Sequence, residues 1–276
     1  MRFIELIMAS VATMMAAVSC GQKKEAPKVL VLYYSQTSNT KAVAQEIADA
    51  LGADMEEIVA LQPYDGDFQA TIQRCMQERE GGILPEIQPL KADIATYDIV
   101  FLGYPVWFGT YAPPVITLLN QIDLAGKKVV PFCTFGSGGL DSSVKELAKQ
   151  QPEAEILPGY GVRAARMQAM PAEVDQFLKA NGFLEGEYVQ LDEFPEPHEA
   201  CKEESAIFDA AVGDYPMINA EAKTVTSRPV PGGVEYRFTA MSLPRADMPA
   251  APPASEMTVY VLALEGKAPE FTQVLR

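Results

Sequence analysis

Residues 28–51 read KVLVLYYSQTSNTKAVAQEIADAL, and the fold can be predicted from this segment outward. Its first part, 29–34, is an apolar run without polar alternation, which is typical of a parallel strand covered on both faces. A polar loop follows at 35–40. After the loop, apolar residues recur at four-residue steps and predict a helix that Gly52 would end: Val43, Ile47 and Leu51. The stretch therefore predicts a strand, a tight polar loop and a helix.

The same alternation continues to about residue 182. Apolar runs at 99–104 and 129–133 predict two more buried strands, and weaker strands are expected at 54–59 and near 155–162. Apolar spacing predicts helices between the strands, at 67–80 and around Val115–Ile122, Val144–Ala148 and Val174–Leu178. Five strand–helix repeats in strict order predict an α/β fold, a right-handed doubly wound five-stranded parallel sheet.

The pattern changes after residue 186. Residues 187–202 are expected to form a linker, and 203–212 an amphipathic helix. Apolar residues then alternate with polar ones through 234–240, and another strand is expected at 257–264. One helix followed by antiparallel strands predicts a small α+β domain over residues 203–276.

The amino terminus carries the features of an export signal. Residues 1–19 hold one arginine, an apolar stretch and then small residues, and they are too short to span a bilayer stably. The stretch Ala17-Val18-Ser19-Cys20 resembles a bacterial lipobox, in which the cysteine is lipidated. This resemblance implies a signal peptide at 1–19, a lipid-anchored tether at 20–27 and a location in the bacterial cell envelope, with ordinary secretion as the alternative.

Composition limits the classes of function. Net charge is −15, and the acidic excess runs through both halves, which argues against nucleic acid as a partner. Contact with a membrane is expected through the lipid anchor only. Apart from Cys20, the cysteines are three in number and lack CxxC spacing: Cys75, Cys133 and Cys201. Because the chain also has one histidine, neither a metal site nor a complete disulfide framework is predicted.

Several single residues have plain structural interpretations. Cys75 and Cys133 fall within apolar patterns and are expected to be buried thiols. His198 lies in the acidic linker and is expected to be solvated, without a nucleophile beside it. Two arginines after the fifth strand are expected to be surface charges, with contact to a substrate anion as the alternative: Arg163 and Arg166.

The loop at 35–40 lies where a doubly wound sheet binds ligands, at the carboxyl end of a strand and before a helix. Free backbone N–H groups and the helix dipole favour an anion there, and four hydroxyl groups add uncharged donors. A helix cap alone would need one hydroxyl. Because the loop lacks glycine and no GxxxxGK[ST] occurs, neither a dinucleotide nor an NTPase fingerprint is supported. The loop predicts a phosphate site.

Two further loops are expected at the same edge of the sheet. The segment 103–111 contains the only tryptophan and several aromatics, among them Tyr104 and Tyr111, which could shield a ring or donate to a substrate carbonyl. The segment 134–139 is rich in glycine, which lets backbone amides approach a ligand closely. Three such loops together predict a site for a flat aromatic ring with a phosphate tail.

These loops resemble those of the flavodoxin family. SQTSNT resembles the [ST]-x-T-G-N-T phosphate loop, with Ser38 in place of glycine, while YDIVFLGYPVWFGT and GKKVVPFCTFGSGG resemble the flavin-contacting loops. The resemblance implies a flavodoxin-like domain over 28–186 with FMN as its cofactor. It also implies that the phosphate is held by Ser35, Gln36, Thr37, Ser38, Asn39 and Thr40. The ring would be lined by Pro105, Val106, Trp107, Phe108 and Gly109 and closed by Phe135, Gly136, Ser137 and Gly138.

Two functions follow as expectations. In the first, the protein is an FMN-dependent redox protein, either an electron carrier that docks on a redox partner or a reductase of a small acceptor such as a quinone. Whether it is an enzyme is left open. In the second, the C-terminal domain binds another protein, since residues 227–236 resemble the Q-x-V-x-G-x-x-Y hairpin of cystatin-like domains, with Arg228 in place of the inhibitors' glutamine.

Overall fold

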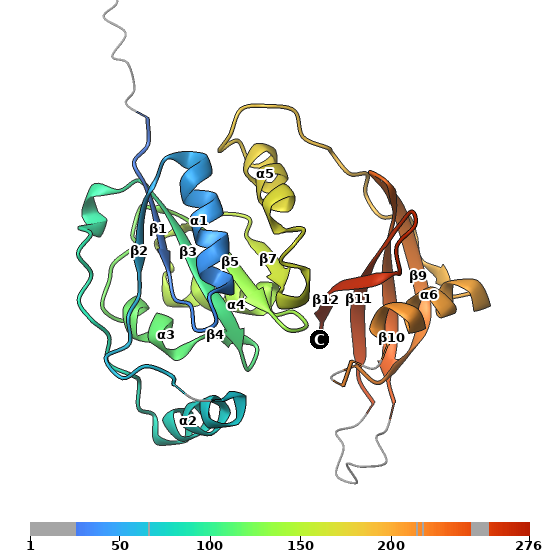
Figure 1. Cartoon of the computed structure of the whole chain (residues 1–276), viewed down its shortest axis with the longest axis horizontal. Coiled ribbons are helices and arrows are strands. Elements are labelled where there is room, and N and C mark those ends of the chain that lie inside the picture. Colours follow the sequence, from blue (N-terminus) through green and yellow to red (C-terminus); the bar gives the residue numbers. More distant parts are fainter. Residues whose placement is uncertain (1–25, 66, 214, 217, 244–253) are drawn as a thin grey trace, which may run out of the picture.

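The computed structural model describes residues 26–65, 67–213, 215–216, 218–243 and 254–276. The predicted signal peptide and Cys20 lie outside these residues. The described chain forms two sheets, one in each half, which Figure 1 shows side by side. Within the described residues, no helix combines the length and the apolar character needed to cross a bilayer.

The N-terminal sheet is parallel and confirms the predicted α/β fold. Its strand order is β2 (Asp54–Glu57), β1 (Val29–Tyr33), β3 (Ile99–Trp107) and β5 (Lys128–Phe135). The strand predicted near 155–162 is two short strands, β6 (Glu155–Ile156) and β7 (Tyr160–Arg163), and both pair with β5. The direction in which strands are added reverses at β1, because β2 lies on one side of it and β3 on the other. In sheets of this kind, ligands bind at such a switch point.

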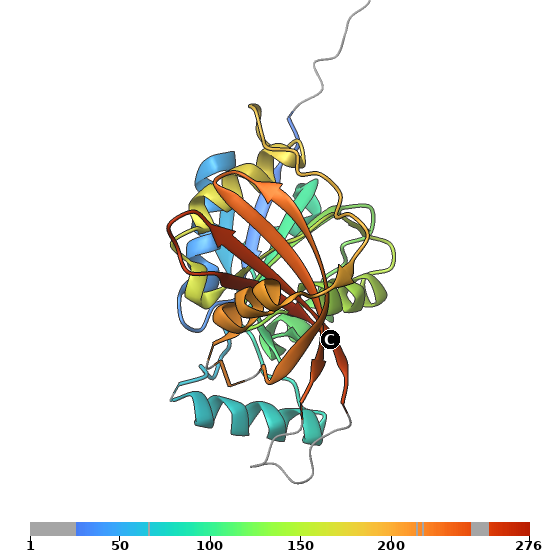
Figure 2. The same ribbon diagram turned by 90° about the vertical axis from the view of Figure 1, so that its right-hand side faces the viewer.

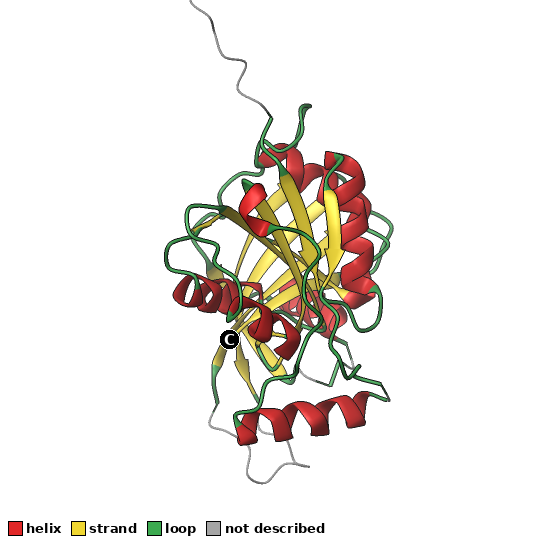
Figure 3. Ribbon diagram, turned by 90° about the vertical axis from the view of Figure 1, so that its left-hand side faces the viewer, coloured by secondary structure: helices red, strands yellow, loops and turns green. Residues whose placement is uncertain are grey.

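Helices cover both faces of this sheet. α1 (Asn39–Leu51) and α5 (Met170–Ala180) bury their apolar residues on one face, together with β1 and β3. α3 (Pro113–Leu119) and α4 (Leu140–Gln150) cover the other face. α2 (Phe68–Gly81) is different, because it lies below the ends of the strands and apart from the other helices (Figures 1 and 3).

The C-terminal sheet is antiparallel, as predicted. It contains β8 (His198–Glu199), β9 (Ala220–Val230), β10 (Gly233–Ser242), β11 (Glu256–Leu264) and β12 (Glu270–Leu275), paired in chain order. α6 (Lys202–Val212) lies across these strands (Figure 2). The core between helix and sheet includes Phe208 packed on Phe238, with ring centroids 5.3 Å apart.

The linker contributes more structure than the sequence predicted. β8 lies within residues 187–202 and pairs with β9, so the second sheet begins before its helix. Upstream of β8, Phe194 packs on Tyr260 with ring centroids 6.0 Å apart. Arg228 donates to the Asp192 carbonyl oxygen at 2.9 Å and to the Glu235 carboxylate at 2.8 Å. The linker therefore packs on the second sheet, through contacts with side chains of β9 and β11.

Candidate functional site

The loop between β1 and α1 has the backbone geometry that an anion site requires. Ser38 precedes the helix with φ 66° and ψ −3°, a left-handed conformation that favours glycine. Its side chain makes no capping hydrogen bond to α1. The first N–H groups of a helix have no partner within the helix, so here they lack the usual side-chain acceptor. They form a positive end that faces the loop.

The hydroxyl groups of the loop differ in their surroundings. Thr37 and Ser38 are exposed, whereas Thr40 is buried and its Oγ1 lies 2.8 Å from Thr134 Oγ1. The Oγ of Ser35 is buried and has no hydrogen-bond partner among the described residues. Leaving such a group unpaired costs about 1–3 kcal/mol. An oxygen-rich ligand seated on this loop would satisfy it.

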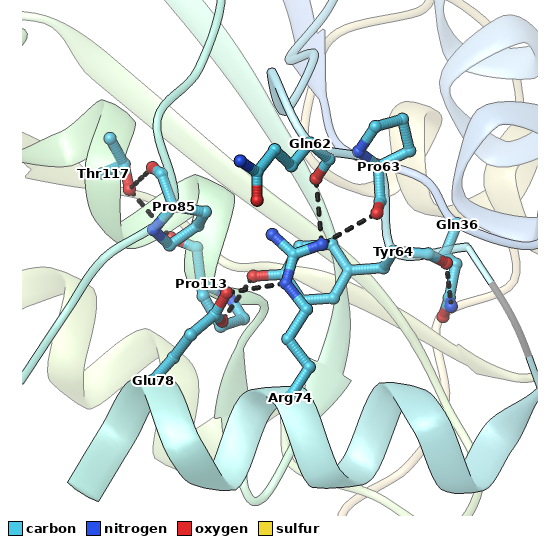
Figure 4. A network of polar contacts seen from close by, with 9 residues as sticks. All are labelled: Gln36, Gln62, Pro63, Tyr64, Arg74, Glu78, Pro85, Pro113 and Thr117. Atoms are coloured by element: carbon cyan, nitrogen blue, oxygen red, sulfur yellow. Dashed lines mark hydrogen bonds and ion pairs between the residues drawn. The ribbon is translucent and has the colours of Figure 1, made fainter. Parts of the chain in front are cut away.

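The side chain of Gln36 is committed to the protein itself. Its amide nitrogen donates to the Tyr64 carbonyl oxygen at 3.0 Å and to Thr71 Oγ1 at 2.8 Å. These bonds join the loop to the segment that leads into α2, as Figure 4 shows for Tyr64. Both side-chain donors of Gln36 are therefore used, and its backbone N–H is the donor that remains for an anionic ligand.

That segment is a fourth part of the site, which no pattern in the sequence predicts. Arg74 of α2 donates to the carbonyl oxygens of Gln62 at 3.0 Å and Pro63 at 2.7 Å, and its Nε to Glu78 at 2.8 Å (Figure 4). Its guanidinium also lies 3.8 Å from the centroid of the Tyr64 ring. The four contacts fix Tyr64 beside the loop. No motif marks this segment, because its partners are mostly backbone carbonyls.

The aromatic segment 103–111 is a strand and a hairpin. β3 continues to Trp107 and turns through Phe108 and Gly109, with φ 52° and 82°, onto β4 (Thr110–Tyr111). Only the turn stands clear of the core, and half of the Phe108 surface is exposed. The ring of Trp107 is half-buried and packs edge-on against two others, at centroid distances of 5.9 Å to Tyr34 and 5.2 Å to Tyr64.

The structure excludes a ligand role for two tyrosines of this segment. Tyr104 and Tyr111 are fully buried. The hydroxyl of Tyr104 donates to Ser143 Oγ at 3.0 Å, and that of Tyr111 to Gln150 Oε1 at 2.5 Å. Burial raises the pKa of both phenols. They anchor α4, because β3 runs on past Tyr104 and turns its side chain into the core.

The glycine-rich loop after β5 makes the close backbone approaches expected of it, but to protein on both sides. A Cβ at Gly139 would lie 2.5 Å from Val106 Cγ1 in the aromatic segment. A Cβ at Gly138 would collide with the Val274 carbonyl oxygen of β12. The N–H of Val274 donates to the Ser137 carbonyl oxygen at 2.6 Å. The loop is therefore held between the hairpin and the C-terminal sheet.

The expectation that Arg163 and Arg166 are surface charges is wrong. Their exposed fractions are 7% and 8%. Arg163 Nη1 donates to the Phe271 carbonyl oxygen at 2.8 Å, and its guanidinium lies 3.4 Å from the centroid of that ring. Arg166 pairs with Glu173 at 2.7 Å and with Glu270 at 3.1 Å. Burial lowers the pKa of Arg163. Both arginines are buried because β12 packs over them.

The predicted surroundings of Cys75, Cys133 and His198 are confirmed. Cys75 and Cys133 are buried, and burial raises the pKa of the Cys133 thiol. Cys201 is exposed. His198 is exposed and lies 2.9 Å from a carboxylate oxygen of Glu204. Across the described part of the chain, no cluster of three or more His, Cys, Asp or Glu side chains could hold a metal ion.

Comparisons with known proteins address the family of this chain. The flavodoxin family model matches residues 28–175. A protein from Bacteroides eggerthii, provisionally described as a flavoprotein, shares 28% identity with a TM-score of 0.50, over 57% of this chain and 99% of that one. One from Bacteroides uniformis shares 27% identity with a TM-score of 0.48, over 55% and 99%.

A third structure is of a flavoprotein in complex with FMN from Lactobacillus acidophilus. It shares 28% identity with a TM-score of 0.45, over 49% of this chain and 93% of that one. All three similarities cover about half of this chain. The family model itself spans more than half of the 276 residues, and it contains the β1–α1 loop, the hairpin and the glycine loop. The chain belongs to the flavodoxin family.

Proposed function

We propose that this protein is an FMN-binding redox protein. The observation that carries the proposal is the loop 35–40, which combines an uncapped helix N-terminus with a buried Ser35 hydroxyl that has no partner among the described residues. Phosphate oxygens are strong acceptors, and they suit N–H and hydroxyl donors at a helix N-terminus. The family model covers the same loop, and a relative of similar fold is described in complex with FMN.

The phosphate would be held by the loop's N–H groups and hydroxyls. Ser35, Thr37, Ser38 and Thr40 supply hydroxyls, while Gln36 and Asn39 supply backbone N–H groups. The flavin ring would lie against the hairpin residues 105–109, with Trp107 at its edge, and against the glycine loop. FMN, when bound, supplies reversible uptake of one or two electrons. The protein contributes binding, orientation and shielding from water.

The charge of the protein sets the direction of its redox potential. Net charge is −15, and nearby negative charge disfavours an anionic reduced flavin. We therefore propose a low-potential electron carrier or a reductase of a small acceptor such as a quinone. NADPH separates the two, since a reductase that takes electrons from NADPH bleaches its own flavin without a partner protein.

Localisation belongs to the same proposal. The Ala17–Cys20 stretch supports a lipid anchor at Cys20, which would hold the protein at the bacterial envelope. Growth with a labelled fatty acid tests this. Label on the wild type and its loss in Cys20→Ser support the anchor, and an unlabelled wild type contradicts it.

The first experiment is an absorbance and fluorescence titration of a soluble form that starts after Cys20. FMN and riboflavin are compared, because they differ by the phosphate alone. FMN is expected to bind much more tightly than riboflavin. Ser35→Ala should reduce this preference about tenfold, as expected for one lost hydrogen bond to a charged group.

Ser205→Ala is the matched control, since it removes a hydroxyl from α6 in the other half of the chain. It should leave both affinities unchanged. If FMN and riboflavin bind equally, the loop does not hold phosphate. If neither binds, the redox function is wrong, and protein binding through the C-terminal domain becomes the function to test.

A further inference from the structure

The C-terminal sheet contacts the proposed cofactor site through one strand. β12 supplies the N–H of Val274 to the Ser137 carbonyl oxygen, the Phe271 carbonyl oxygen to Arg163, and the Glu270 carboxylate to Arg166. Figure 1 shows β12 next to β7 and near the end of β5. These contacts join the last strand of the second sheet to the glycine loop and the residues after β7.

Arg163 connects the two sides of this contact. Its Nε donates to the Gly136 carbonyl oxygen at 3.0 Å, while Nη1 donates to the Phe271 carbonyl oxygen at 2.8 Å. The guanidinium also stacks on the Phe271 ring. One buried side chain therefore fixes the distance between the glycine loop and β12. A planar guanidinium suits this task, because its donors have a rigid geometry.

The carbonyl contacts determine where the loop's N–H groups point. In a planar trans peptide, the C=O of one residue and the N–H of the next point in opposite directions. The described chain contains no cis peptide bond. The Gly136 carbonyl is directed at Arg163 and the Ser137 carbonyl at Val274. The N–H groups of Ser137 and Gly138 must therefore point away from Arg163 and β12.

The glycine at 138 is needed for this arrangement. Any Cβ there would collide with the Val274 backbone, so the loop can approach β12 this closely only with glycine. On its other side the loop packs on Val106 through Gly139. The conformation of the loop is thus determined by contacts from two parts of the chain, and one of them lies outside the family match at 28–175.

We propose that β12, acting through Arg163 and Val274, is a positioning element of the cofactor site. It holds the N–H groups of Ser137 and Gly138 toward a carbonyl-type acceptor on the flavin ring. The proposal rests on the proposed function, because it names the part of that site which the second sheet builds. In this proposal β12 affects binding of the flavin ring, whereas the loop 35–40 affects binding of the phosphate.

Four variants of the soluble form that starts after Cys20 test this. Arg163→Met removes both carbonyl contacts, and Arg163→Lys keeps the charge on a single donor nitrogen. Arg237→Met is the matched control, because Arg237 lies over Phe194 on the second sheet, with its guanidinium 4.7 Å from that ring centroid. Glu270→Ala is a milder fourth variant, which removes one carboxylate partner of Arg166. It serves as the test if Arg163→Met does not fold.

Arg163→Met should weaken the binding of FMN and of riboflavin by the same factor, about tenfold, because both ligands carry the same ring. Arg163→Lys should recover part of the loss, Glu270→Ala should lose less than tenfold, and Arg237→Met should match the wild type. Loss of FMN affinity alone would place Arg163 with the phosphate and overturn the proposal. Unchanged affinities for both flavins would also overturn it.

A second readout needs no cofactor. In the ligand-free protein, amide NMR signals of Ser137 and Gly138 should shift or broaden in Arg163→Met and stay unchanged in Arg237→Met. Unchanged signals in Arg163→Met would overturn the positioning role. If the wild type binds neither flavin, the proposed function fails, and these signals still decide whether β12 positions the loop.

Discussion

Glycine in place of Ser38 should stabilise this protein. The backbone at Ser38 has φ 66°, and a left-handed conformation costs a residue with a Cβ about 1–2 kcal/mol. Glycine avoids this strain but loses about 0.4–1 kcal/mol through the greater freedom of the unfolded chain. The difference predicts that Ser38→Gly is more stable than the wild type by about 0.5–1 kcal/mol.

Ser38→Ala separates backbone strain from the hydroxyl group. Alanine keeps the Cβ and removes an exposed hydroxyl that makes no capping bond, so its stability should lie within about 0.5 kcal/mol of the wild type. Urea unfolding of the ligand-free protein measures both variants. Trp107 fluorescence is a suitable signal, because this is the only tryptophan and it lies in the first sheet. A glycine variant no more stable than the alanine variant would refute the strain argument.

Other predictions concern the core, the pH range and the thiols. Gly103→Ala would push a methyl group into the ring of Phe132 and should lower the free energy of unfolding in urea by about 1–3 kcal/mol. In a double-mutant cycle, adding Phe132→Leu should recover much of that loss, and additive losses of stability would contradict the clash. Burial raises the pKa of Tyr33 to about 12, so the unfolded chain loses this proton near pH 10 while the folded protein keeps it. Stability should therefore be full below pH 10 and fall between pH 10 and 12, with a smaller fall in Tyr33→Phe; an equal fall in both would contradict the assignment. In the native soluble form that starts after residue 20, a thiol reagent should label Cys201 alone. The buried thiols of Cys75 and Cys133 should react only after denaturation.

The sequence predicts the first sheet well because its information is local. β1, β3 and β5 are covered on both faces, and each reads as a continuous apolar run. The positive φ at Ser38 agrees with the glycine that the common motif has at this position. The edge of the sheet where the loops gather follows from alternation alone, because parallel strands bring their carboxyl ends together.

The sequence could not predict contacts between distant segments. Both Arg163 and Arg166 have a partner in β12, about a hundred residues further on, so no local pattern reveals that this strand covers them. The side chain of Gln36 is taken by Tyr64 and Thr71 for the same reason. The roles expected for Tyr104 failed because the sequence does not reveal that β3 continues to Trp107.

The contact between Val274 and Ser137 has a consequence for the order in which the molecule is made. A ribosome completes the β1–α1 loop early and β12 late, so a growing chain can fold the first sheet long before its glycine loop receives support. A chain that stops short of Glu270 would keep a complete family domain and still lack the strand that holds this loop. Maturation of the site would then wait for the final residues of the second sheet to be synthesised and docked.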